Sequence, residues 1–185
     1  MEDDRILVKD ILEGRRGAME RFVRAHQETC WRVLYRLTGD REDARDLCQE
    51  AFLRAHRALP SFRFDASLKT WTTRIAWSVG LRHLEKRRIP LDAFTDVDDA
   101  ADQADDAEDI ASALVREERR AQVRAALSKL APVQRTLLGM YHFEDMTLPD
   151  ISRVTGMPVG TIKSHLFRGR LALRQQLIRH PECTP

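Results

Sequence analysis

The residues of this sequence best suited to a binding chemistry lie between 147 and 174, TLPDISRVTGMPVGTIKSHLFRGRLALR. Thr147 can cap a short helix, and Gly156 can supply a turn because glycine reaches positive φ without a clash at Cβ. A second helix is predicted next, with apolar residues on one face and hydroxyl and basic side chains on the other. Two short helices joined in this way predict a helix-turn-helix, whose second helix enters the major groove of DNA. The apolar set is Ile151, Val154, Val159, Ile162, Leu166, Leu171 and Leu173.

The outward face of the second predicted helix carries the side chains that we expect to contact duplex DNA. Hydroxyl and basic groups can hydrogen-bond base edges or phosphates, and the helix N-terminus near Gly160 favours a phosphate. Phe167 has two interpretations, as a DNA contact or as a core residue. The whole stretch also has an alternative, a plain helical hairpin with a solvated basic face. The candidate base contacts are Lys163, Ser164, Phe167 and Arg168, and the candidate phosphate contacts are Thr161 and Arg170.

A different kind of face is predicted in residues 40–57, DREDARDLCQEAFLRAHR. Apolar residues fall on one side of this helix, and acidic and amide side chains fall on another at i, i+3 and i+4 spacings. An acidic face would repel the phosphates of DNA, so it suits a protein partner with a basic surface. The alternative is an ordinary solvated helix face. Its residues are Asp43, Asp46, Gln49 and Glu50.

Residues 62–88, FRFDASLKTWTTRIAWSVGLRHLEKRR, interleave aromatic and basic side chains. Unstacked bases need aromatic planes or pockets, and the backbone of single-stranded DNA needs cations. The segment therefore predicts a surface that binds single-stranded DNA. The aromatic residues are Phe62, Phe64, Trp71 and Trp77, and the basic residues include Arg63, Lys69, Arg74, Arg82, Lys86, Arg87 and Arg88.

Helical periodicity extends through most of the chain, and no segment shows the alternation and turn dipeptides of a strand pair. The sequence therefore predicts an all-α protein. Gly39 and Pro60 mark the ends of two of its helices. The predicted helices cover about residues 3–13, 16–37, 41–58, 68–88, 115–129 and 132–142, followed by the helix-turn-helix, with a loop at 61–67.

The net charge of +2 hides three blocks of different sign. Residues 1–88 carry 19 Lys and Arg against 14 Asp and Glu, residues 89–115 carry nine acids and no Lys or Arg, and residues 116–185 carry 12 bases against six acids. Like charge and few large apolar residues predict a flexible, extended middle block. The prediction is therefore two small helical domains, 1–88 and 116–180, joined by an acidic linker at 89–115.

Composition argues against several classes of protein and site. No run of ~18 apolar residues is present, so no membrane insertion is expected. The acidic start MEDDRILVKD does not resemble a secretion signal, and three cysteines without a CxxC pair fit the cytoplasm. His26 and Cys30 lie one helical turn apart without a second pair of ligands, so no metal is expected, and Cys48 is predicted to be a core residue. No catalytic motif is found, so we expect neither catalytic residues nor a cofactor.

Taken together, the three segments resemble those of a bacterial RNA polymerase sigma factor of the extracytoplasmic-function class (ECF, group IV of the sigma-70 family). DREDARDLCQEAF is similar to the region 2 helix that binds the clamp helices of RNA polymerase. SLKTWTTRIAWSVGLRHLEKRR resembles the segments that open and read the −10 promoter element, and residues 126–177 resemble region 4, which reads the −35 element. The resemblance extends from about residue 10 to about residue 178.

This resemblance implies a partner or a contact for each candidate residue. The protein would bind the clamp helices and flap of core RNA polymerase, promoter DNA and an anti-sigma factor, and would not be an enzyme. Trp71 is expected to pack inside the bundle. The implied polymerase contacts are Asp43, Asp46, Gln49 and Glu50. The implied −10 contacts are Arg63, Phe64, Asp65, Lys69, Arg74, Trp77, Ser78, Arg82, Lys86 and Arg87. The implied −35 contacts are Gly160, Thr161, Lys163, Ser164, His165, Phe167, Arg168 and Arg170.

The sequence departs from the family pattern at three of these positions. Trp77 and Ser78 stand where the family commonly has Arg and Asn, and His165 stands where it often has Arg. A direct amide contact to a −10 base is therefore not expected, and a different −10 preference is possible. The departure at His165 also weakens the positive charge of the −35 face.

Two other classes of protein, and two roles for the linker, remain open on the sequence. A non-sigma regulator would lack both the acidic helix and the aromatic-basic segment, and a nucleic-acid enzyme would need Asp65 or Asp150 to hold a metal without a spaced partner. The linker acids either keep two basic domains soluble or take the place of nucleic-acid phosphates in a channel of polymerase. The acids in question are Asp96, Asp98, Asp99, Asp102, Asp105 and Asp106.

Overall fold

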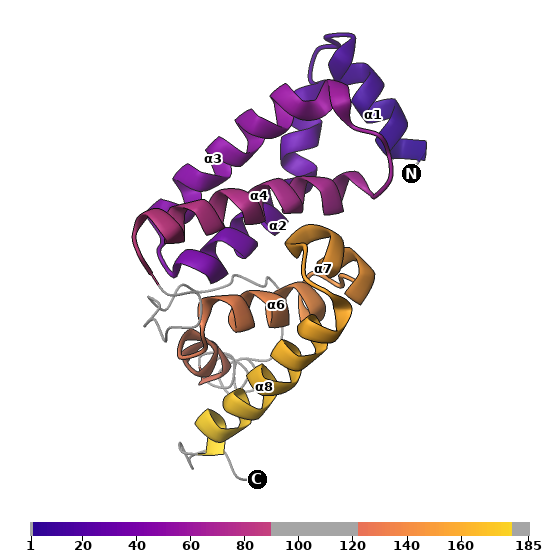
Figure 1. Ribbon diagram of the computed structural model, residues 1–185. Coiled ribbons are helices and arrows are strands. Elements are labelled where there is room, and N and C mark those ends of the chain that lie inside the picture. The colour runs from indigo at the N-terminus through magenta and orange to yellow at the C-terminus, as the bar shows by residue number, and fades with distance from the viewer. Residues whose placement is uncertain (1, 90–121, 179–185) are drawn as a thin grey trace, which may run out of the picture.

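The computed structural model describes residues 2–89 and 122–178, and within these residues it contains helices and no strand (Figure 1). The all-α prediction is confirmed, and so are the two helical domains. The predicted linker at 89–115 lies, apart from residue 89, outside the described residues. The first domain contains α1 (Glu2–Leu12), α2 (Ala18–Thr38), α3 (Arg41–Ala58), the short 3-10 turn η1 (Leu59–Ser61) and α4 (Leu68–Lys86). The second contains a helical segment at residues 122–128, then α6 (Pro132–His142), α7 (Leu148–Thr155) and α8 (Val159–Ile178).

Local capping signals explain where the helices of the first domain begin and end. Gly39 ends α2 with φ of 76°, and its N–H donates to the carbonyl of Tyr35. Asp40 then caps α3, because its carboxylate accepts from the backbone N–H of Asp43 at 2.8 Å. Ser67 caps α4 in the same way through the N–H of Thr70. Each cap satisfies a helix-end group that would otherwise lack a partner.

Helices α2, α3 and α4 enclose the core of the first domain, which includes Phe22, Leu34, Ala51 and Cys48. The core position predicted for Cys48 is confirmed. Helix α4 packs closely on α2 at Gly80. A Cβ at that glycine would lie 2.7 Å from Cδ1 of Leu37, so a larger residue there would push the two helices apart.

The helix-turn-helix forms as the sequence predicts. The side chain of Thr147 caps α7 by accepting from the N–H of Asp150 at 3.2 Å, and Gly156 makes the turn with φ of 74°. The inward side chains are buried at Ile151, Val154, Ile162 and Leu166. The inward position predicted for Leu171 is wrong, because that side chain is 48% exposed.

The two domains pack against each other, a contact that the sequence does not predict. Helix α2 contacts α6, and α4 contacts α7 (Figure 1). The apolar cluster at this interface combines Val33, Leu37 and Trp77 of the first domain with Leu137 and Met140 of the second. The described residues therefore contain one apolar core inside the first domain and another that both domains share.

The turn of the helix-turn-helix gives a matched pair of glycine substitutions. No side chain lies within 4 Å of a Cβ built on Gly156 or on Gly160, but only Gly156 has positive φ. We expect Gly156→Ala to lower the free energy of unfolding by about 1–2 kcal/mol, because a Cβ is strained in the left-handed region. Gly160→Ala should raise it by up to about 1 kcal/mol, because alanine favours helix. Urea unfolding of both variants checks this, and equal effects would contradict the assignment.

Candidate nucleic-acid and protein-binding surfaces

Helix α8 presents most of its hydroxyl and basic side chains to solvent. Ile162, Leu166 and Gly169 turn inward, and Gly169 sits so close to Leu138 of α6 that its Cβ would lie 2.9 Å from that side chain. This packing fixes the rotation of α8 about its axis. Seven of the eight predicted duplex-contact residues are exposed, and His165 is half-buried. The exposed residues other than Phe167 are Gly160, Thr161, Lys163, Ser164, Arg168 and Arg170.

Phe167 lies on the same outward face, with 65% of its surface exposed. The core alternative for this residue is therefore wrong. An aromatic side chain on a recognition helix, flanked by basic and hydroxyl side chains, can contact the methyl group of thymine. Arg168 folds back along the helix, and its Nε–H donates to the carbonyl of Ser164 at 3.4 Å.

Helix α3 presents a second exposed face, with Asp46, Gln49 and Glu50 open to solvent. Glu50 accepts from Arg54 at 2.5 Å, one helical turn along. Leu53 is 59% exposed and lies i+3, i+4 and i+7 from these three residues, so it belongs to the same face. Leu53 was not predicted from the sequence to belong to this face, although its spacing from Asp46 and Gln49 would have indicated it. An exposed leucine among acids suits a protein surface better than nucleic acid.

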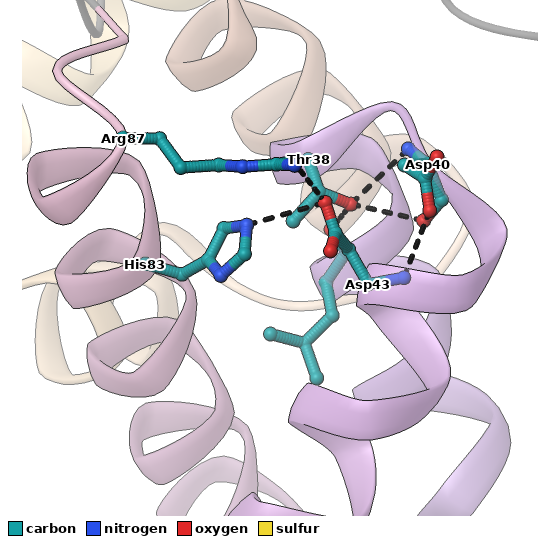
Figure 2. A network of polar contacts seen from close by, with 6 residues as sticks. Thr38, Asp40, Asp43, His83 and Arg87 are labelled. Carbon is teal, nitrogen blue, oxygen red and sulfur yellow. Dashed lines mark hydrogen bonds and ion pairs between the residues drawn. The ribbon is translucent and has the colours of Figure 1, made fainter.

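Asp43 differs from the rest of that face because it is bound within the protein (Figure 2). Its Oδ2 lies 3.2 Å from Nε2 of His83 and accepts from Nη1 of Arg87, both at the end of α4. Asp40, which caps α3, is in turn contacted by Thr38 at the end of α2 (Figure 2). Asp43 thus joins the start of α3 to the end of α4.

The predicted single-strand surface divides into exposed and covered parts. Arg74, Ser78, Arg82 and Lys86 are all exposed and follow one another at i+4 spacing along α4. They form a stripe that can run beside a nucleic-acid backbone. Arg87 is exposed as well, but its guanidinium is bound to Asp43.

The loop before α4 holds Phe64 in the left-handed region, with φ of 59°. Its ring packs against Phe62 at 4.6 Å between centroids, and the guanidinium of Arg5 covers it at 4.6 Å. Phe62 also contacts Trp71, which packs against the first-domain core as predicted. Arg63 and Asp65, on either side of Phe64, are exposed. The loop therefore exposes two charged side chains on either side of an aromatic ring that Phe62 and Arg5 hold in place.

Trp77 and Lys69 lie against the second domain instead of facing solvent. Trp77 is 2% exposed and belongs to the apolar cluster shared by the domains. Its indole Nε1–H has no acceptor among the described residues. Lys69 is half-buried, and its ammonium donates to the backbone carbonyl of Glu144 at 2.8 Å.

Neither a metal centre nor a reactive thiol is formed by the described residues. Among them, no group of three or more His, Cys, Asp or Glu side chains is placed to hold a metal ion. Burial lowers the pKa of His26 and raises that of Cys30, and it raises the pKa of Cys48 to about 11. Both thiols are therefore protonated and unreactive at neutral pH. No helix in the described ranges has the length and apolar character needed to cross a membrane.

Comparison with known sequences identifies both domains. Residues 22–89 match the family description Sigma-70 region 2, and residues 120–173 match Sigma-70, region 4. The chain is 35% identical to RNA polymerase sigma-H factor of Pseudomonas aeruginosa over 95% of its own length and 94% of the relative's. It is 30% identical to ECF RNA polymerase sigma-E factor of Escherichia coli (strain K12), over 95% and 96% of the two chains.

Solved structures support the same fold. The chain is similar to CnrH, whose structure was solved in complex with the cytosolic domain of CnrY, with a TM-score of 0.66, 22% identity and coverage of 95% and 97% of the two chains. It is also similar to the sigma factor RpoE from Bartonella quintana, crystallised with the anti-sigma factor NepR, with a TM-score of 0.66, 19% identity and coverage of 87% and 97%. At these identities the likeness establishes the fold alone.

The different environments of Asp43 and Asp46 predict different effects on stability. Asp43→Asn removes the charge that binds His83 and Arg87, so we expect it to lower the free energy of unfolding by about 1 kcal/mol. Asp46→Asn changes an exposed side chain of the same helix and should stay within about 0.5 kcal/mol of the unmodified protein. Urea unfolding measures both. Equal losses would show that Asp43 does not fasten α3 to α4.

Proposed function

The chain belongs to the RNA polymerase sigma factors of the ECF class, and from this premise we propose how its surfaces divide the work of promoter recognition. As a sigma factor, it binds core RNA polymerase and directs it to promoters. The observation that carries the proposal is the separation of two exposed faces of opposite chemistry. An acidic and amide face lies on α3, and a basic and aromatic face lies on α8.

The α3 face is assigned to the clamp helices of core polymerase. Asp46, Gln49 and Glu50 supply charge and hydrogen bonds, and Leu53 supplies an apolar contact at the C-terminal end of this face. Asp43, included among the expected contacts, instead positions α3 by holding it to α4. The flap of polymerase is assigned to the second domain.

The α8 face is assigned to the −35 duplex. Lys163, Ser164, Phe167 and Arg168 face the base edges, with His165 beside them. Arg contacts to guanine and aromatic contacts to thymine methyl groups give discrimination between bases. Contacts to phosphate fix the register of the helix without reading sequence. These are assigned to Gly160, Thr161 and Arg170.

The −10 non-template strand is assigned to α4 and the loop before it. The stripe of Arg74, Ser78, Arg82 and Lys86 follows the strand's backbone, with Arg87 at its end. Arg63, Phe64, Asp65 and Lys69 frame a pocket for a base that has left the stack, and Trp77 adds an aromatic surface once it is uncovered.

Several features of the whole protein follow from the same proposal. The sigma region 2 domain occupies residues 1–88, the linker 89–115 and the region 4 domain 116–180. The protein acts by binding alone, so the polymerase performs the chemistry. It works in the cytoplasm with the polymerase, and an anti-sigma factor restrains it when its promoters are not needed.

Run-off transcription with purified protein, core polymerase and a library of promoter fragments tests the function directly. Discrete start sites that share −35 and −10 elements are expected. Duplex DNA binding without any transcript would contradict the assignment to a sigma factor and favour a regulator that uses the same helix-turn-helix.

The polymerase face gives the first variant for this assay. Asp46→Lys combined with Glu50→Lys should abolish assembly with core polymerase, because two like charges then face a basic partner surface. Glu20→Lys with Glu13→Lys, a matched reversal of two exposed acids elsewhere in the first domain, should assemble normally. Native gel shift of core polymerase measures assembly, and circular dichroism confirms that the helices are intact. Normal assembly of the first double variant would refute the assignment of α3.

The recognition helix gives a matched pair of arginine variants. Arg168→Ala removes a base contact, so it should reduce the preference for the −35 duplex over scrambled DNA by about tenfold. Arg170→Ala removes a phosphate contact, so it should weaken both duplexes alike and lower the salt dependence of binding. Fluorescence anisotropy at several salt concentrations distinguishes them. An equal loss on both duplexes for Arg168→Ala would contradict its assignment.

A further inference from the structure

Helix α1 precedes the part of the chain that matches Sigma-70 region 2, which begins at residue 22, and the surfaces assigned to DNA and polymerase do not include it. Its second half is fixed to the first domain. Val8 is buried in the first-domain core. The buried carboxylate of Asp10 accepts from Nη2 of Arg21 on α2 at 2.6 Å and lies 3.1 Å from Nη1 of Arg15. These contacts hold α1 in one place, so its first turn has a defined position as well.

Two consecutive residues in the first turn of α1 contact the loop before α4 at two separate points. The guanidinium of Arg5 lies 4.6 Å from the centre of the Phe64 ring. The carboxylate of Asp4 accepts from the backbone N–H of Leu68, the first residue of α4, at 2.9 Å. That N–H is one of the donors that a helix leaves unpaired at its start, and a negative charge is favoured there. The loop thus runs past the N-terminal end of α1 and is held by it at Phe64 and at Leu68 (Figure 1).

The loop needs such support because of its backbone. Phe64 has φ of 59°, a conformation that is strained for a residue with a Cβ and persists only when the surroundings hold it. The ring of Phe62 supports Phe64 from within the loop, and Arg5 supports it from α1. Arg63 and Asp65 are the neighbours of Phe64 in the chain, so a change in its backbone would move both of these exposed side chains.

The contact of α1 with the loop is polar and specific to two side chains. A helix end that only completed an apolar core would bury its apolar residues there, but Ile6 is 53% exposed. Arg5 and Asp4 instead use a guanidinium and a carboxylate, each aimed at one group of the loop or of the start of α4. Interactions of this kind fix the shape of a loop more than they add to its burial.

We propose that α1 is a third element of the −10 site, in which Asp4 and Arg5 are positioning residues that hold the loop at 62–67 in the shape that receives a base. The proposal rests on the assignment of this loop to a −10 base that has left the stack. A loop that is already in shape avoids the cost of ordering on binding. Loss of either support should therefore weaken binding of the base. Binding of the strand's backbone, which is assigned to the stripe along α4, should not change.

Two pairs of variants separate the supports from the charges that they carry. Arg5→Ala removes the cation from the Phe64 ring, whereas Arg5→Lys keeps a cation that can lie over it. Asp4→Ala removes the acceptor for the N–H of Leu68, whereas Asp4→Asn keeps an oxygen that can accept from it. The control is Lys9→Ala, which removes a positive charge from the same helix one turn further on, where Lys9 pairs with Glu13.

The measurement is the affinity of holoenzyme for the single-stranded −10 element of the non-template strand, by fluorescence anisotropy. The sequence of this oligonucleotide is taken from the start sites found by run-off transcription, and a series of probes carries one abasic position each. For the parent, removal of the base that enters the pocket should lower affinity about tenfold. The same position should matter equally for Lys9→Ala.

The alanine variants at the two supports should behave differently from the parent. Arg5→Ala and Asp4→Ala should bind the intact oligonucleotide about tenfold more weakly, and removal of the sensitive base should then make little further difference. Arg5→Lys and Asp4→Asn should restore binding to within about threefold of the parent. The salt dependence of binding should be the same for all variants, because neither support touches a phosphate.

Several outcomes would overturn the positioning role. Parent-like affinity and base dependence in both alanine variants would show that the loop keeps its shape without α1. A lower salt dependence for Arg5→Ala would show that Arg5 binds a phosphate instead of holding Phe64. All variants should also assemble with core polymerase as the parent does, because the face of α3 is unchanged. Loss of assembly would show that α1 acts on the whole fold.

The parent alone tests the function on which this proposal rests. If no abasic position lowers the affinity of the parent holoenzyme, the loop does not receive a base, and the assignment of the loop is refuted together with the role of α1. If one position does lower it, and the alanine variants show the same dependence on that base, the role of α1 is refuted and the assignment of the loop stands.

Discussion

Helix α2 packs on two sides, and most of the structure depends on that constraint. One side contributes Phe22 and Leu34 to the core of the first domain, and another contributes Val33 and Leu37 to the core shared with the second. Polar side chains lie between these two apolar sides of α2. Thr29, Arg32 and Arg36 are among them, and all three meet the same carboxylate of Glu144. The position of the second domain is thus set by how α2 divides its surface.

Local features were predictable because their causes lie within a few residues. The cap at Thr147, the turn at Gly156 and the bounds of α3 follow from hydrogen bonds and backbone preferences between near neighbours. The helix-turn-helix and the all-α fold were therefore available from the sequence. The interface was not, because Arg36 and Glu144 are 108 residues apart and each looks like an ordinary solvated charge. Periodicity identifies an apolar face but not which partner covers it.

The same limit explains the uneven outcome for the site residues. Asp43 and Asp46 are the same residue type on the same helix. Only Asp43 is bound within the protein, because His83 and Arg87 at the end of α4 reach its carboxylate. Trp77 was expected to contact DNA because of its neighbours in sequence, yet it is buried in the apolar cluster that both domains share. Phe167 had even alternatives in the sequence, and the packing of Gly169 on Leu138 turned it outward. In each case the decisive contact is tertiary.

The composition of the interface bears on how readily it can separate. Separating an interface costs about 25 cal/mol for each Å² of apolar area that is exposed to water. Apolar groups gain no new interaction that offsets this cost. Buried ions behave differently, because Glu144 and the arginines around it regain solvation when they part, which offsets much of the lost attraction. A contact that combines a moderate apolar cluster with a buried carboxylate and an unpaired indole is therefore less stable than a fully apolar one of equal size.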